Sequence, residues 1–320
     1  MKKWYEIIPV DTLFFRGNIP LEAGQKASSV LFPPPVSVFK GAIRTAHLEQ
    51  NGVKIKDYVE GKADAQVYEK IGKPGSDSPF EITAVLLKKN GVLYAPVPAV
   101  WYADDALLSG GSDFIVLSVA QRREKELQKL GAFSAPANPS VVNDAENPAA
   151  LAGRWVKLEM LSKMRPGEML KKSDILAASD FYDIEERTGI GLDSSKRVIK
   201  GKLYSGMHLR MKEGVSFVLA IDKDGVISDS GFLCIGGENR VCGYKIMQPP
   251  QLPEKGSLFM ALSPVKADLT VLSCLVASQR LYASAGWDMV KKFHKPTVSW
   301  LPAGAVFSEK ISESLVPLAQ

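Results

Sequence analysis

Short runs of apolar residues, many alternating with polar ones, occupy much of the chain and predict β-strands. Asn90-Gly91 lies between two such runs, and this dipeptide favours the tight turn of a β-hairpin. The predicted strands cover residues 4–15, 81–88, 92–101, 114–119, 215–221, 232–235, 241–247, 257–263, 269–278 and 297–308. The pattern therefore predicts a protein built largely from antiparallel sheets.

The clearest helical pattern begins directly after a run of three prolines. The apolar positions that recur there at helical spacing, and that can be buried, are Val36, Phe39, Ile43 and Ala46. Ser37 stands where a side chain can cap the start of this helix. Weaker helical patterns cover residues 57–71, 121–130 and 173–181, and residues 154–163 fit either a helix or a strand.

The polar side of the same helix is basic. Lys40, Arg44 and His47 recur at i, i+4 and i+7, and Arg16 lies in the long loop before the helix. A helix start with a basic flank under such a loop can receive an anionic backbone, with Ser37 at its head. The alternative is a helix whose lysine and arginine side chains are only solvated, and these residues alone favour that simpler interpretation.

A second basic region follows in the middle of the chain. Between residues 187 and 212 there are seven basic residues and one acid, Asp193. Arg187, Lys196 and Arg197 belong to this region, and glycines alternate with its charges. A loop of this composition can lie closely against a chain of phosphates, whereas the alternative is a solvated hairpin arm with exposed lysines.

A glycine pair precedes the predicted strand at residues 241–247. Gly236 and Gly237 leave backbone N–H groups accessible and let another backbone approach closely, with Arg240 shortly after them. Most glycine pairs of this kind are simply turns, so the pair is a weak signal of a binding loop by itself.

Length and composition are those of a folded protein with two domains. The chain has 320 residues, 46% of them hydrophobic and 23% charged. Residues 132–152 carry prolines among small polar residues without periodicity, which predicts a boundary between a unit at 1–150 and a unit at 151–320. The order strand, helix, strand, strand opens a βαββαβ ferredoxin-like unit. The later strands are numerous enough that the two folds can interleave.

Charge and cysteine content narrow the function only slightly. The net charge of +5 permits a polyanionic partner and does not require one. Three cysteines form no CxxC pair, so reduced thiols in a cytoplasmic protein are expected. No signal peptide and no run of about 18 apolar residues is present, so we expect no membrane association.

Several motifs, in a fixed order, resemble the third-subunit family of CRISPR type III-B (Cmr) complexes, which belongs to the RAMP superfamily. These motifs are Phe14-Phe15-Arg16-Gly17, residues 29–35, residues 40–46, residues 187–193, Leu203-Tyr204-Ser205, residues 236–240, Gly286-Trp287-Asp288, Lys295-Pro296 and residues 302–307. Asn239 departs from the resemblance, because a small residue, usually glycine, is expected there. Asparagine is the best substitute for glycine at positive φ, so the resemblance still holds.

The resemblance implies an α+β fold of tandem ferredoxin-like (RRM-like) βαββαβ domains with antiparallel sheets and long inserted loops. It also implies a non-catalytic subunit that binds the 5′ repeat-derived tag of the guide RNA. The implied protein partners are the large polymerase-like subunit and the first backbone subunit of the complex. The expected RNA contacts are Arg16, Ser37, Lys40, Arg44, Arg187, Lys196, Arg197, Gly236, Gly237 and Arg240.

The main alternative is a metal-independent RAMP endoribonuclease that processes CRISPR transcripts. Such chemistry needs a general acid or base, usually histidine, beside a lysine or tyrosine. His47, His208 and His294 are the histidines of the chain, and each sits where a structural role or a phosphate contact is more common. No HExxH, paired-aspartate, cysteine-histidine or Walker spacing occurs, so we expect no metal and no cofactor. A third interpretation is a free-standing RRM that binds RNA by stacking, but the sequence lacks the aromatic-rich signature of such a domain.

Overall fold

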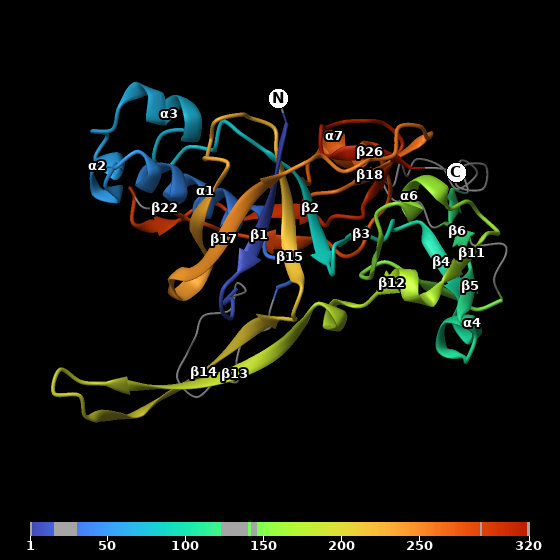
Figure 1. Ribbon diagram of the computed structural model, residues 1–320, viewed down its shortest axis with the longest axis horizontal. Helices are drawn as coiled ribbons and strands as arrows, with labels where there is room; N and C mark the ends of the chain where they lie inside the picture. Colours follow the sequence, from blue (N-terminus) through green and yellow to red (C-terminus); the bar gives the residue numbers. More distant parts are fainter. Residues whose placement is uncertain (1, 16–30, 123–139, 142–145, 289, 319–320) are drawn as a thin grey trace.

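The computed structural model describes residues 2–15, 31–122, 140–141, 146–288 and 290–318. Its centre is an eight-stranded antiparallel sheet (Figure 1). In spatial order the strands are β12 (Ile175–Leu176), β10 (Trp155–Lys157), β3 (Val92–Pro96), β2 (Ile82–Lys89), β15 (Val215–Ile221), β1 (Lys3–Pro9), β17 (Arg240–Met247) and β16 (Ser230–Ile235). The sheet therefore takes strands from both sides of the predicted boundary at residue 150.

Alternation along the strands builds one hydrophobic core on each face of this sheet. On β1, Tyr5 and Ile7 enter the core that contains α1 (Val36–Gln50), whereas Trp4 enters the core on the opposite face. The central strand β15 is buried on both faces, which explains its uninterrupted apolar run. Two short helices, α2 (Ile55–Val59) and α3 (Ala65–Ile71), follow α1 (Figure 1).

The strand order contains a split βαβ unit. β1, α1 and β2 follow one another in the chain, and β15 lies between β1 and β2, antiparallel to both. With β17 on the other side of β1, the four central strands have the order β17-β1-β15-β2. The predicted hairpin at Asn90-Gly91 is confirmed as β2–β3, and both turn residues have positive φ. The strand that completes the unit nevertheless comes from residues 215–221.

The C-terminal residues form a smaller sheet with the same order. It consists of β20 (Leu275–Ala277), β25 (Val306–Phe307), β18 (Leu258–Ala261) and β26 (Leu315–Leu318), with α7 (Leu269–Ser273) between β18 and β20 in the chain. When strands are numbered along the chain, this sheet and the four central strands of the large sheet both have the spatial order 4-1-3-2. Two further groups lie nearby in sequence: β19 (Val265–Lys266), β24 (Val298–Leu301) and β21 (Tyr282–Ser284), and β22 (Trp287–Asp288) with β23 (Phe293–His294).

The segment between β3 and β15 holds the remaining elements. They are β4 (Trp101–Asp104), α4 (Asp105–Ser109), β5 (Phe114–Val116), β6 (Ser118–Val119), β7 (Gln121–Arg122), β8 (Ser140–Val141), β9 (Pro148–Ala150), α6 (Met160–Lys163), β11 (Met169–Lys171), β13 (Tyr182–Leu192) and β14 (Val198–Met211), with 3-10 turns at Lys172–Asp174 and Ala178–Asp180. Among the described helices, none is long and apolar enough to span a membrane.

Several local predictions differ from the structure. The helix expected at 121–130 begins in the strand β7, and its remaining residues lie outside the described part. The strand expected at 269–278 starts as α7, because Asp268 accepts a hydrogen bond from the backbone N–H of Val271 and caps a helical turn. The helix expected at 173–181 is replaced by two 3-10 turns around β12. Residues 154–163 contain both a strand and a helix, β10 and α6.

Candidate nucleic-acid interface

The most prominent basic feature is a long hairpin arm, formed by β13 and β14, that projects from the body (Figure 1). Because side chains alternate along each strand, the arm has two unlike faces. One face exposes Ile184, Ile190 and Leu192, and Val198 pairs with Leu192 near the tip. The other face carries charged residues near the body. This basic region therefore has the hairpin form that the sequence analysis gave as the alternative to a phosphate-binding loop.

The tip of the arm is an ordered turn with free cations. One carboxylate oxygen of Asp193 accepts hydrogen bonds from the backbone N–H groups of Ser195 (2.8 Å) and Arg197 (2.9 Å). Lys196 completes the turn at φ 61°. The side chains of Lys196 and Arg197 are exposed and have no ion pair with any described residue. Since Asp193 contacts backbone groups, it leaves both cations available to an anion from outside.

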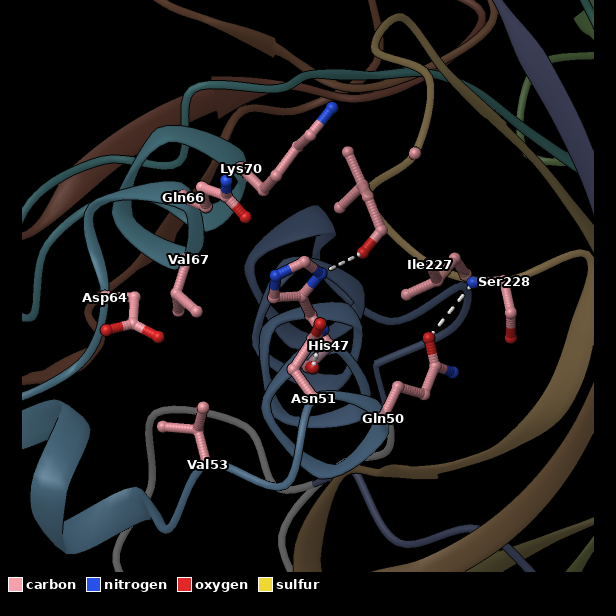
Figure 2. Close-up of a pocket in the computed structure, with 12 residues that line it drawn as sticks. His47, Gln50, Asn51, Val53, Asp64, Gln66, Val67, Lys70, Ile227 and Ser228 are labelled. Atoms are coloured by element: carbon pink, nitrogen blue, oxygen red, sulfur yellow. Dashed lines mark hydrogen bonds between the residues drawn. The ribbon is translucent and has the colours of Figure 1, made fainter.

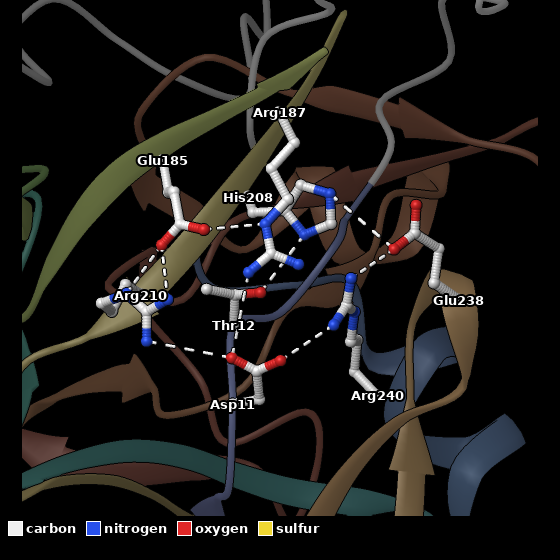
Figure 3. Close-up of polar contacts among 8 residues, drawn as sticks. All are labelled: Asp11, Thr12, Glu185, Arg187, His208, Arg210, Glu238 and Arg240. Atoms are coloured by element: carbon white, nitrogen blue, oxygen red, sulfur yellow. Dashed lines mark hydrogen bonds and ion pairs between the residues drawn. The ribbon is translucent and has the colours of Figure 1, made fainter. Parts of the chain in front are cut away.

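The base of the arm is occupied by an ion-pair cluster (Figure 3). Asp11, just after β1, lies 3.0 Å from Arg240, 3.8 Å from Arg210 and 3.9 Å from Arg187. Glu185 bonds Arg187 and Arg210, each at 2.7 Å. Glu238 completes the cluster, which is defined by Asp11, Glu185, Arg187, Arg210, Glu238 and Arg240.

The charges of this ion-pair cluster balance, because three guanidinium groups face three carboxylates. A hydrogen bond from the backbone of Thr12, together with the arginines, holds the pKa of Asp11 below its ordinary range, so this carboxylate stays charged. A phosphate could reach Arg187 or Arg240 only by competing with carboxylates already in place. The cluster therefore connects the arm to the body and presents little excess positive charge.

His208 lies beside the ion-pair cluster and is 2% exposed. Its ring stacks on Phe14, with centroids 4.7 Å apart, and Nδ1 lies 3.4 Å from the hydroxyl of Thr12. Burial lowers the pKa of His208 below its ordinary value, and Arg187 lowers it further against the opposing effect of Glu238. The neutral ring is thus favoured, and its position suits packing better than proton transfer to a bound RNA.

The glycine pair, Gly236 and Gly237, lies against another segment of the same chain. Gly237 donates its N–H to the carbonyl of Phe14 at 2.9 Å. A Cβ at Gly236 would lie 2.5 Å from the same carbonyl oxygen, and one at Gly237 would lie 2.7 Å from the ring of Phe14. Glycine is required here because the 236–240 loop packs on the residues after β1. Asn239 has φ 49°, as expected for a substitute at a glycine position.

The basic side of α1 makes contacts within the protein. Lys40 donates to both carboxylate oxygens of Glu81 at 2.8 Å. Arg44 donates to the carbonyl of Ile71 at 2.6 Å, and to those of Lys73 and Ser76 at 3.2 and 3.1 Å. These hydrogen bonds hold α1 against the residue just before β2, and against the end of α3 and the loop that follows it. Neither side chain faces solvent without a partner, in contrast to the tip of the arm.

Ser37 and Arg16 are the other two residues near α1 that were expected to contact RNA. The prediction that Ser37 caps α1 was wrong: Pro35 is the cap residue, no side-chain hydrogen bond closes the helix start, and Ser37 is exposed inside the first turn. The run of prolines fixes the chain direction, and the helix begins two residues earlier than a serine cap at Ser37 requires. Arg16 lies outside the described residues.

The structure brings Arg187, Arg240 and the glycine pair together, while Lys40 and Arg44 belong to another side of the fold. Sequence reasoning missed Asp11 and Glu238, which neutralise the arginines. No local signal identifies them, because residues 11, 187 and 238 meet only through pairing of distant strands. Among the described residues, no group of three or more His, Cys, Asp or Glu is placed to hold a metal ion.

Comparison with known proteins gave matches of two kinds. The family model described as CRISPR-associated protein (Cas_Cmr3) matches residues 5–258. A chain in a type III-B Cmr-beta complex bound to cognate target RNA and AMPPnP has a TM-score of 0.55 at 17% identity, over 95% of this chain and 86% of that one. A chain in the Cmr-beta complex bound to cognate target RNA gives 0.55 and 17%, over 97% and 87%.

A chain of a type III-A Csm3–Csm4 subcomplex reaches a TM-score of 0.45 at 12% identity, over 99% of this chain and 100% of that one. At these identities the two Cmr-beta matches establish a shared fold. The fold is thus mixed α and β, with antiparallel sheets and few helices. A comparison with curated proteins found no match.

Proposed function

The chain belongs to the CRISPR-associated Cas_Cmr3 family, and we propose that it is a non-catalytic subunit of a type III-B RNA-guided effector complex. In this proposal it binds the 5′ tag of the guide RNA and contacts the large polymerase-like subunit and the first backbone subunit. The observation that carries RNA binding is the tip of the arm, where Lys196 and Arg197 are exposed and unpaired among the described residues. Phosphate contacts, rather than base contacts, dominate such an interface.

The repeated strand order supports the proposal of tandem ferredoxin-like units. The order 4-1-3-2 in β17-β1-β15-β2 and again in β26-β18-β25-β20 is that of a βαββαβ unit, with the first helix present in each as α1 or α7. We place the boundary between the units near residue 250, after β17, instead of at residue 150. The arm is then an insertion into the first unit.

The ten predicted RNA contacts divide into three groups in this proposal: direct contacts, structural residues and two remaining candidates. Lys196 and Arg197 contact phosphates directly, and Arg187 supports the arm from the ion-pair cluster. Lys40 and Arg44 position α1, because binding RNA would require both to break their contacts with the protein. Gly236, Gly237 and Arg240 hold the base of the arm, and Arg16 and Ser37 remain candidates for direct contact.

The face of the arm opposite its charged residues offers a surface for contact with partner proteins. Ile184, Ile190, Leu192 and Val198 are 57, 47, 50 and 64% exposed. A ribbon with exposed apolar residues on one face and charges on the other favours contact with protein and RNA at once. We assign the apolar face to a neighbouring subunit of the complex.

Two of the three histidines, His47 and His208, support the absence of catalysis, whereas His294 is exposed. His47 donates a 2.6 Å hydrogen bond to the carbonyl of Val226, and His208 is buried against Phe14. Neither stands beside the exposed cations of the arm tip. A general acid needs access to the leaving oxygen, which these two side chains lack.

The test is a titration of guide RNA affinity against salt, using labelled RNA that carries its 5′ tag. Lys196→Ala/Arg197→Ala is expected to weaken binding by about tenfold near 0.1 M salt, and to lower the log–log salt slope by about 1.4, or 0.7 for each lost phosphate contact. The matched control Lys54→Ala/Lys56→Ala removes two exposed charges from the start of α2. Its affinity and slope should equal those of the parent.

Equal slopes for all three proteins would mean that the arm tip does not contact RNA. The same samples report on catalysis. A discrete cut in the RNA that disappears in His47→Ala or His208→Ala would replace the proposal with the endoribonuclease alternative. Chelator treatment should leave RNA affinity unchanged.

A further inference from the structure

A cavity of about 470 Å³ lies at the end of α1, away from the arm (Figure 2). Its wall combines residues from the end of α1, from the start of α3 and from the loop between β15 and β16. His47, Asn51, Val53, Asp64 and Val67 contribute the side chains that matter below. None of them takes part in the proposed RNA contacts.

His47 is 7% exposed, and its hydrogen bond fixes what it offers to the cavity. Nδ1 lies 2.6 Å from the carbonyl oxygen of Val226. A carbonyl can only accept, so the neutral ring carries its proton on Nδ1 and leaves Nε2 as a hydrogen-bond acceptor. Figure 2 shows this second nitrogen on the side of the ring turned toward Val67 and Asp64. No described residue donates to it.

Asp64 adds a charged acceptor. It is the cap residue of α3, yet its side chain makes no capping hydrogen bond, and its carboxylate has no hydrogen-bond or ion-pair partner among the described residues. Asn51 donates its amide nitrogen to the carbonyl of His47 at 2.7 Å, which leaves its amide oxygen as a third acceptor. The unoccupied polar groups at this wall are therefore mostly acceptors.

Two of the donors that line the cavity, Gln50 and Lys70, are already engaged, whereas the amide of Gln66 has no hydrogen-bond partner among the described residues. Gln50 bonds the hydroxyl of Tyr244 and the backbone N–H of Ser228. Lys70 donates to the carbonyl of Asp224 at 3.3 Å, and Figure 2 shows its ammonium group at the far end of a side chain directed away from His47. A ligand that pairs with the free acceptors of His47, Asp64 and Asn51 must therefore supply hydrogen-bond donors of its own.

We propose that this cavity binds an arginine side chain of a partner protein. A guanidinium group supplies five N–H donors in one plane, which match His47 Nε2, the Asp64 carboxylate and the Asn51 amide oxygen. Its flat, weakly hydrated faces suit the apolar walls of Val53 and Val67. A nucleobase fits less well, because each base edge carries acceptors as well as donors, and a neutral base lacks the positive charge that pairs with Asp64. The inference concerns assembly and is independent of RNA binding by the arm.

The experiment is an NMR titration of the full chain labelled with ¹⁵N-histidine, which has only three histidines to resolve. The probe is a capped Gly-Arg-Gly peptide, and its counterpart carries citrulline, the uncharged analogue of arginine. The arginine peptide should shift the His47 signal saturably and leave His208 unchanged. The citrulline peptide should bind about tenfold more weakly, because it lacks the charge that pairs with Asp64.

Asp64→Asn tests the site without changing side-chain size and should weaken the arginine peptide by about tenfold. Glu69→Gln is the matched control, since Glu69 is an exposed carboxylate on α3 that does not line the cavity, and it should bind like the parent. Equal affinity for the arginine and citrulline peptides, or an unshifted His47 signal, would overturn the inference. Tighter binding of adenosine monophosphate than of the arginine peptide would also overturn it and assign the cavity to a nucleobase.

Discussion

The base and the tip of the hairpin arm carry the same kinds of basic residue in opposite electrostatic settings. At the base, Arg187, Arg210 and Arg240 each contact a carboxylate, and the side chain of Arg240 is only 17% exposed. At the tip, Lys196 and Arg197 have no acidic partner among the described residues. The unpaired arginine and lysine charge is thus found at the end of the arm, and the arginines at its base are paired.

This difference shows that a basic run in the sequence does not by itself indicate how much positive charge is left unpaired in the folded protein. Asp11, Glu185 and Glu238 neutralise the base, and of these Asp11 and Glu238 are far from the run in the chain. A buried or bridging arginine contributes to folding, whereas an exposed unpaired one contributes mainly to long-range attraction. The two ends should therefore respond to mutation in different measurements.

The largest effect is expected from Arg240→Ala. This side chain joins Asp11 and Glu238, so its loss leaves two carboxylates without their nearest cation, and Glu238 lies 3.9 Å from the buried His208. We expect the free energy of unfolding to fall by about 2 kcal/mol. Urea denaturation measures the change. Arg240→Lys should recover little of it, because an ammonium group cannot bridge both carboxylates as a guanidinium does.

Lys196→Ala provides the comparison at the other end of the arm. Its side chain is exposed, so its removal should change the free energy of unfolding by less than about 0.5 kcal/mol. Equal losses for Arg240→Ala and Lys196→Ala would show that the base is no more structural than the tip.

Local patterns predicted the parts of the fold that depend on neighbours in sequence. The β2–β3 hairpin follows from Asn90-Gly91, and α1 follows from its apolar spacing. Insertion of β15 between β1 and β2 could not be predicted, because strand order depends on contacts across more than a hundred residues of chain. For the same reason the sequence pattern predicts RNA contacts for the glycine pair and does not indicate that Phe14 of the same chain approaches it.

An intermediate effect is expected from pH, through His208. Burial lowers its folded-state pKa below the value of about 6.5 expected for the unfolded chain. The unfolded state therefore binds this proton first as pH falls, so stability is fully present above about pH 6.5 and decreases below it. In His208→Phe, which keeps a ring against Phe14, the free energy of unfolding should depend less on pH.

Urea denaturation of both proteins between about pH 7.5 and about pH 5.5 measures this difference. The other two histidines and all carboxylates are present in both proteins, so the difference between the curves reports the replacement of His208. Parallel curves would mean that His208 titrates alike in the folded and unfolded states.

The smallest effect is expected from Asp11→Asn, which changes the charge of the base by one unit. Asp11 is 50% exposed and contacts three arginines, so solvent and salt screen its interactions. Stability should fall only slightly, and the loss should disappear near 1 M salt. At low salt the unbalanced arginines should raise guide RNA affinity, by less than about threefold, if the RNA extends from the tip toward the base. Asp183→Asn is the matched control, because Asp183 pairs only with Lys212, at 3.5 Å, on the same arm. A gain in affinity larger than the loss in Lys196→Ala/Arg197→Ala would reverse the comparison and make the base the main RNA contact.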